Sequence, residues 1–166
     1  AVLSVHVFHL LSDWQTALVE VRRVLRPGGV FLTGHDERPP DSTPNRLHAR
    51  WREIVRERGL SENHPGTHDF ADIRAALLTQ GTTLEERACA EWTRARSLAH
   101  HLETIEHRAW SSTWAVPEAF FPACMAELRA WAAAAIGPPE HEVVTSYRFI
   151  WQAFRFPENA PARALL

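Results

Sequence analysis

Polar side chains able to do proton chemistry follow two apolar stretches near the start of the chain. Ser4, Val5 and His6 end the first stretch, and His35 and Asp36 end the second. If both stretches are parallel strands, these residues meet at the carboxyl edge of the sheet, where open α/β folds bind their ligands. An imidazole titrates near neutral pH, so it can accept a proton from a bound substrate. Asp36 could orient a substrate amine or a histidine.

His9 follows three residues after His6, and both are candidates for a general base. The structural alternative is that one of the two packs against the sheet while the other is solvated. For Asp36 the alternative is a loop carboxylate with no chemical role. The residue types alone leave these alternatives open.

The residues between the two stretches predict a helix and a tight turn. Ser12 and Gln15 have the three-residue spacing of a capping box. The apolar residues that follow repeat at helical spacing, at Trp14, Leu18, Val21 and Leu25. Pro27 cannot continue the helix, and Gly28 and Gly29 can take positive φ where the chain reverses. Strand, helix and strand in this order are half of a βαβ crossover and predict a parallel pair.

The first 32 residues resemble the second half of the class I (type 11-like) S-adenosylmethionine-dependent methyltransferase domain. Their sequence is AVLSVHVFHLLSDWQTALVEVRRVLRPGGVFL. In that family a linker with histidine or asparagine follows the fourth strand. A helix ending in Arg-Val-Leu-x-Pro-Gly-Gly then precedes the fifth strand, and Arg23 to Gly29 reproduces this motif. The resemblance covers about the first fifth of the chain, and the remainder is similar only in its order of elements.

The resemblance implies a Rossmann-like, three-layer α/β methyltransferase sheet made of strands four to seven of seven. It implies S-adenosyl-L-methionine as cofactor, bordered by the backbone of Ser4, Val5 and His6, and it places His9 toward the substrate pocket. The family's glycine-rich loop and its ribose-binding acidic residue are not in this sequence, which starts at Ala1. We therefore expect a truncated chain that lacks the N-terminal cofactor half.

The later residues predict four more helices and two more strands. Helices are expected from Ser42 to Gly59 and from Phe70 to Gln80, a strand over 82–93, a helix over 98–108, a helix from Pro117 to Ile136, and a strand over 143–156. By the resemblance, the last strand lies antiparallel between the fifth and sixth. The expected order in space is therefore residues 1–5, 30–35, 144–156 and 83–92.

The segment 94–139 is a candidate cap over the substrate site. The resembling family often carries an insertion there, and Arg108, Ser111 and Trp114 could shape an acceptor pocket with His9, His35 and Asp36. The alternative is a loop between helices whose tryptophans fill the core. We expect residues 1–157 to form part of one methyltransferase domain, with 158–166 as a tail.

The composition limits the classes of partner and the cellular location that we expect for this chain. The 166-residue chain has a net charge of −2 and no lysine, which gives no reason to expect nucleic acid and suggests a GC-rich bacterial genome. No apolar run is long enough for a membrane span, so a cytoplasmic location is expected. Cys89 and Cys124 stand alone in apolar patterns and are expected to be buried thiols. The histidines near His100 lack the spacing of a zinc site, so no metal is expected.

The function expected from these observations is methyl transfer to a small molecule, with this chain inactive by itself. The alternative from another class is a non-catalytic, methyltransferase-like scaffold or partner subunit. The coding DNA before Ala1 discriminates between them, because a strand followed by a glycine-rich loop would support the enzyme. Neither the acceptor atom nor the oligomeric state follows from the sequence.

Overall fold

The computed structural model describes residues 1–61, 66–67 and 69–158. The elements follow one another as β1 (Val2–Val5), η1 (Phe8–Leu10), α1 (Trp14–Val24), β2 (Val30–Glu37), α2 (Thr43–Glu57), α3 (Phe70–Thr79), β3 (Thr83–Ser97), α4 (Leu98–Glu106), η2 (Ser111–Thr113), α5 (Phe121–Ala135) and β4 (Glu142–Arg155). The chain divides into two compact units. The first unit comprises residues 1–37, 64–90 and 148–166, and the second comprises residues 38–63 and 91–147.

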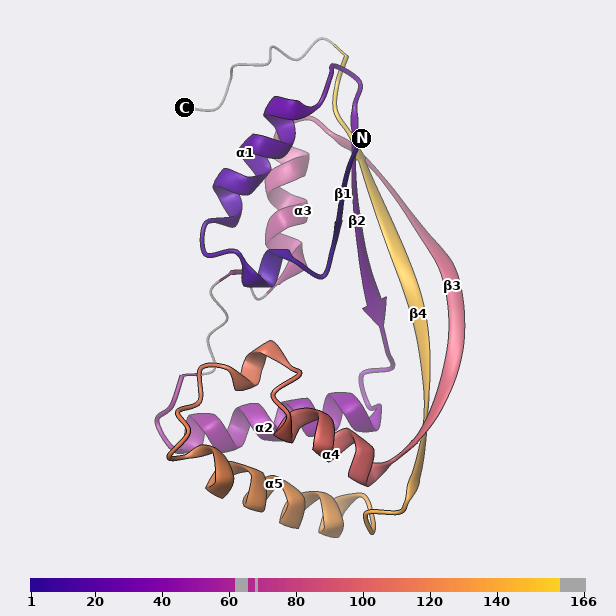
Figure 1. The fold of residues 1–166 in the computed structure, drawn as a ribbon. Coiled ribbons are helices and arrows are strands. Elements are labelled where there is room, and N and C mark those ends of the chain that lie inside the picture. The colour runs from indigo at the N-terminus through magenta and orange to yellow at the C-terminus, as the bar shows by residue number, and fades with distance from the viewer. Residues whose placement is uncertain (62–65, 68, 159–166) are drawn as a thin grey trace. The chain divides into compact units, whose positions relative to one another are not determined.

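The four strands form one mixed sheet in the order β1-β2-β4-β3 (Figure 1). β1 and β2 are parallel, with Val2 opposite Phe31 and Val5 opposite Gly34. β4 pairs antiparallel with β2 from Val30–Arg155 to Glu37–Arg148. The expected α/β class and the expected order, in which the last strand lies between the second and the third, are confirmed.

In the first unit, α1 and α3 cover one face of the sheet (Figure 1). Side chains alternate between faces along a strand, so Phe31, which is fully buried, and Phe154 point toward these helices. Leu3 and Val5 lie on the other face and are 62% and 41% exposed. The turn between α1 and β2 uses Gly28 at φ 71°, a backbone angle that glycine adopts without strain.

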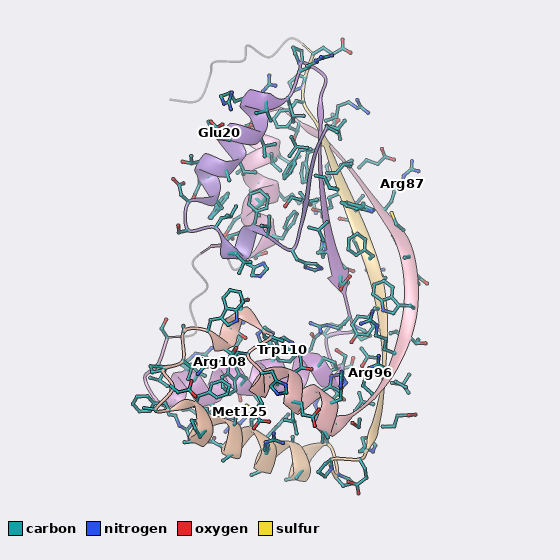
Figure 2. The ribbon with its side chains drawn as sticks, in the orientation of Figure 1. Glu20, Arg87, Arg96, Arg108, Trp110 and Met125 are labelled. Atoms are coloured by element: carbon teal, nitrogen blue, oxygen red, sulfur yellow. The ribbon has the colours of Figure 1, made fainter. Side chains whose placement is uncertain are left out.

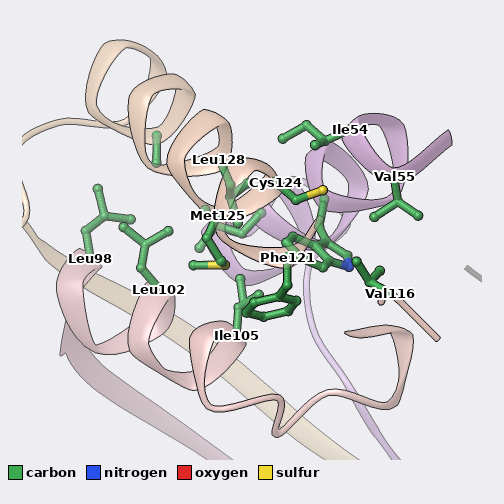
Figure 3. Close-up of a cluster of buried hydrophobic side chains, with 13 residues drawn as sticks. Ile54, Val55, Leu98, Leu102, Ile105, Val116, Phe121, Cys124, Met125 and Leu128 are labelled. Atoms are coloured by element: carbon green, nitrogen blue, oxygen red, sulfur yellow. The ribbon is translucent and has the colours of Figure 1, made fainter. Parts of the chain in front are cut away.

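The second unit is built on α2, α4 and α5, and Figure 2 labels Arg108, Trp110 and Met125 among these helices. Its core includes Trp51 of α2, which is fully buried and packs against Phe121 of α5 with ring centroids 5.3 Å apart. Figure 3 shows Phe121 close to Ile105 of α4 and Val116 in this core. Glu127 of α5 accepts hydrogen bonds of 2.6 Å from both Arg50 and Arg58 of α2. Packing and paired charges thus hold α2 and α5 together.

Several boundaries differ from the sequence-based prediction. The prediction of a Ser12 cap is wrong: Asp13 is the N-cap of α1, and its carboxylate accepts a hydrogen bond from the Thr16 amide at 3.0 Å. β3 continues to Ser97, and α5 begins at Phe121 rather than at Pro117, with Pro122 in its first turn. Residues 159–166 of the expected tail lie outside the described part of the chain.

The two thiols differ in their surroundings. Cys124 is buried in the core of the second unit, as expected. Cys89 is exposed, so the prediction that it is buried is wrong. It lies on β3 at the edge of the sheet, and nearly all of that strand's residues are exposed. An apolar residue pattern does not reveal that a strand has a partner on one side only.

Candidate functional site

The carboxyl ends of β1 and β2 lie side by side in the first unit. Ser4 is in register with Thr33, and Val5 with Gly34, so His6 and His35 follow at the same edge of the sheet. Parallel strands create this edge because both leave the sheet in the same direction. The structure therefore brings together five of the sequence-predicted site residues, namely Ser4, Val5, His6, His35 and Asp36.

A pocket of about 180 Å³ opens at this edge. Its walls come from the end of β1, from η1, from the end of β2, from Thr67 and from the start of α3. The lining residues are Ser4, His6, Val7, Phe8, His9, Thr33, Gly34, His35, Thr67, Phe70 and Ile73. Four of the predicted site residues are thus in the lining, whereas Val5 and Asp36 are not.

His6 turns the chain out of β1 with a φ of 49°, a left-handed conformation that is uncommon for residues other than glycine. Its Nε2 lies 3.8 Å from Asp36 Oδ2, and both side chains are nearly half exposed. This distance is too long for a hydrogen bond but short enough for an ion pair when the imidazole is protonated. Solvent screens such a pair, so its main effect is to orient His6 at the pocket.

His9 lies in η1, one turn after His6. Burial lowers the pKa of His9 below the usual value for histidine, and the positive charge of protonated His6 lowers it further. The imidazole is therefore neutral at pH 7 and keeps a lone pair that can accept a proton. A general base has to be unprotonated before it accepts a proton, so His9 suits this role among the histidines that line the pocket.

Gly66 holds η1 in place. Its amide donates a hydrogen bond of 3.1 Å to the carbonyl oxygen of His9. A Cβ atom at Gly66 would lie 2.1 Å from the carbonyl oxygen of Phe8, so only glycine permits this approach. Sequence reasoning missed this role, because Gly66 is far from η1 along the chain and stands in a polar segment.

His35 is held by a chain of charged groups along the sheet. Its Nε2 lies 3.4 Å from Glu37 Oε1, and Arg148 Nε donates a hydrogen bond of 2.7 Å to Glu37 Oε2. The hydrogen bond from Arg148 is the main cause that lowers the pKa of Glu37, which therefore stays ionised. The His35 ring also stacks on Phe70, with centroids 5.6 Å apart. Glu37 and Arg148 were missed, because their contact depends on the register of β2 with β4.

Two polar atoms of lining residues have no hydrogen-bond partner in the described part of the chain. They are Thr33 Oγ1 and His35 Nδ1, and both are buried. Buried polar atoms are normally paired. The polar group of a bound molecule, or a water, is the kind of partner that would satisfy them.

The other predicted substrate residues belong to the second unit and do not line this pocket. Arg108 donates hydrogen bonds to the carbonyl oxygens of Thr113 and Val116 at 2.7 and 2.9 Å. The Trp114 indole donates to the carbonyl oxygen of Arg108 at 2.8 Å, and Ser111 begins η2. These contacts hold the connection between α4 and α5, and a role in substrate binding stays a prediction.

The described residues contain no group of three or more His, Cys, Asp or Glu side chains placed to hold a metal ion. Within the same residues, no helix has the length and apolarity needed to cross a membrane.

Comparison with known proteins finds a match to the family described as "Methyltransferase domain" over residues 1–33. A solved structure from Anaeromyxobacter dehalogenans, named a "Putative Type II Methyltransferase", is 19% identical with a TM-score of 0.54. A "putative methyltransferase" from Bacillus halodurans C-125 is 14% identical with a TM-score of 0.49, over 93% of this chain and 68% of its own. No curated protein matches.

The similarity to the first structure covers 93% of this chain, and the chain spans 64% of that protein's length. The family match falls on the same residues that carry the Arg-Val-Leu-Arg-Pro-Gly-Gly motif. The resemblance to the class I methyltransferases is thereby confirmed for residues 1–33, and over the rest of the chain the likeness to the first structure is one of fold alone.

Proposed function

We propose that this chain supplies strands four to seven of a class I methyltransferase domain that transfers a methyl group from S-adenosyl-L-methionine to a small molecule. The observation that carries the proposal is the pocket at the carboxyl ends of β1 and β2, on a sheet whose last strand returns antiparallel beside β2. In the resembling family the cofactor lies at this edge. A cytoplasmic bacterial enzyme without a nucleic-acid or membrane partner is part of the proposal.

The pocket fits one end of the cofactor or of the acceptor rather than a whole cofactor. Its volume of about 180 Å³ is below the ~300–1,000 Å³ of ordinary ligand pockets. Its unpaired polar atoms, Thr33 Oγ1 and His35 Nδ1, suit the polar groups of a ligand. The glycine-rich loop that holds the rest of the cofactor in the family is not in this sequence, so we propose that this chain alone is inactive.

The cofactor, when bound, supplies a methyl group on a positively charged sulfur. The residues of this chain would then position the acceptor in line with the methyl group and take the acceptor's proton as the acceptor receives that group. Neutral His9 accepts that proton, and Phe8, Phe70 and Ile73 give the pocket apolar walls that exclude water. His6, paired with Asp36, borders the same pocket and is the second candidate for proton transfer.

The experiment uses the longer protein, in which this chain is joined to the segment encoded before it. The change His9→Gln is expected to lower kcat by about 10²–10⁴-fold, the usual contribution of a general base. Because the pKa of His9 is lowered, the wild-type rate should rise with pH, with the midpoint of the rise below pH 6.5. The control is His107→Gln, which removes an exposed histidine of the second unit. An unchanged rate in His9→Gln would rule out this residue as the base.

A further inference from the structure

Two arginines lie close to an aromatic pair in the second unit. Trp92 of β3 and Tyr147 of β4 stack almost parallel, with ring centroids 5.5 Å apart and planes 4° apart. The Arg94 guanidinium lies 5.9 Å from the Trp92 centroid and 5.8 Å from that of Tyr147. Arg38 lies 5.9 Å from the Tyr147 centroid. Two cations therefore share one aromatic stack.

A third arginine belongs to the same face. Trp92, Arg94 and Arg96 occupy alternate positions of β3, so their side chains leave the strand on one side. Arg96 stands at the end of β3, where α4 begins (Figure 2). Arg38 and Arg96 are both close enough to His101 to lower its pKa, after the larger effects of burial and of His100. Arg38, Arg94 and Arg96 are called the arginine cluster below.

Within the described part of the chain, no carboxylate is paired with the arginine cluster. None of its three members forms an ion pair with a residue that the structure describes. Other arginines of the second unit are paired with acids, as in Arg50 and Arg58 with Glu127 and Arg129 with Glu106. Like charges that gather without a counter-charge raise the local potential and attract anions.

Two buried polar atoms in the same region also lack a partner in the described residues. They are Trp92 Nε1 and His101 Nε2, and His101 is only 9% exposed. An indole N–H can only donate, so its partner has to be an acceptor. Arg94 and Arg38 contact the aromatic rings, and Arg96 donates a hydrogen bond of 3.0 Å to the carbonyl oxygen of its neighbour Ala95. None of these contacts satisfies Trp92 Nε1 or His101 Nε2.

We propose that the arginine cluster, with Trp92, binds the carboxylate or phosphate group of a small molecule. An oxyanion supplies the acceptor atoms that guanidinium groups and an indole N–H require, and guanidinium groups bind such groups with two parallel hydrogen bonds. The site lies within the second unit and does not depend on the function proposed for the pocket of the first.

The test is an NMR titration of the full chain labelled at the tryptophan indole nitrogens. The Trp92 signal is assigned as the one lost in Trp92→Phe. Sodium benzoate and inorganic phosphate are added in separate titrations at constant ionic strength. The Trp92 signal is expected to move and saturate with a dissociation constant roughly in the millimolar range for at least one of them.

The change Arg94→Gln should weaken this binding by about tenfold, since hydrogen bonds to charged groups are among the stronger ones. Arg96→Gln, the second variant, should weaken it in the same direction. The matched control is Arg74→Gln, which removes an equal charge from an exposed position on α3 and should leave the titration unchanged. A Trp92 signal that does not saturate with either anion would overturn the site, and so would equal binding in Arg94→Gln and Arg74→Gln.

Discussion

Replacing Trp51 by alanine is expected to lower the free energy of unfolding of the helical second unit by about 3–5 kcal/mol. Trp51 is fully buried, its ring packs on Phe121, and its Nε1 donates a hydrogen bond of 3.3 Å to the Ser112 carbonyl oxygen. The substitution removes the largest side chain of that core and leaves a cavity beside α5. Since whole domains are stable by only ~5–15 kcal/mol, much of this unit should unfold.

Hydrogen exchange of the α2 and α5 amides, measured with and without the substitution, checks this expectation. The control is Trp114→Ala, because Trp114 is 56% exposed and its indole donates a hydrogen bond to the Arg108 carbonyl oxygen. Its loss should cost roughly 1 kcal/mol. If both substitutions change the exchange rates of the α2 and α5 amides by the same factor, Trp51 does not stabilise this core more than Trp114 does.

The chain by itself is expected to associate in solution. β1 is the edge strand of the sheet, and an unpaired edge is a template for pairing with another chain. On the face away from α1 and α3, Leu3 is in register with Leu32, and Val5 with Gly34. Leu3 and Val5 are exposed, and an apolar patch of this kind favours association.

Size-exclusion chromatography measures this association directly. The change Leu3→Lys places a charge on the edge strand and should shift the chain toward the monomer. Leu78→Lys, at a position 42% exposed on α3, adds the same charge away from the edge and should have little effect. Adding the N-terminal cofactor half that we propose for this domain, even as a separate polypeptide, should also raise its solubility. A monodisperse monomer that melts cooperatively without any addition would show this expectation to be wrong.

Local patterns predicted most of the fold. The apolar spacing from Trp14 to Leu25 and the Pro27–Gly29 turn are features of neighbouring residues, so the α1 and β2 boundaries follow closely from them. The strand order came from the family resemblance and is confirmed. The cap of α1 was misplaced by one residue because Ser12 and Asp13 are both good caps, and only the geometry selects Asp13.

The candidate site was predicted less completely, because part of it depends on contacts distant in sequence. Ser4, His6, His9 and His35 could be selected, since strand ends and residue types are local. Gly66 acts through the backbone of η1, and Arg148 acts through Glu37 across the β2–β4 register. Neither contact can be recognised from the local sequence pattern. The lowered pKa of His9 is likewise a result of burial, which spacing alone does not give.

We propose that the pocket of the first unit is one part of a methyltransferase site, which a separate N-terminal cofactor half completes. Calorimetric titration with S-adenosyl-L-methionine tests it most directly, with this chain alone and with the two polypeptides mixed. We expect no binding at micromolar concentrations for the chain alone and micromolar binding for the mixture. Micromolar binding by the chain alone would contradict the account, and so would a mixture that is folded and binds no cofactor.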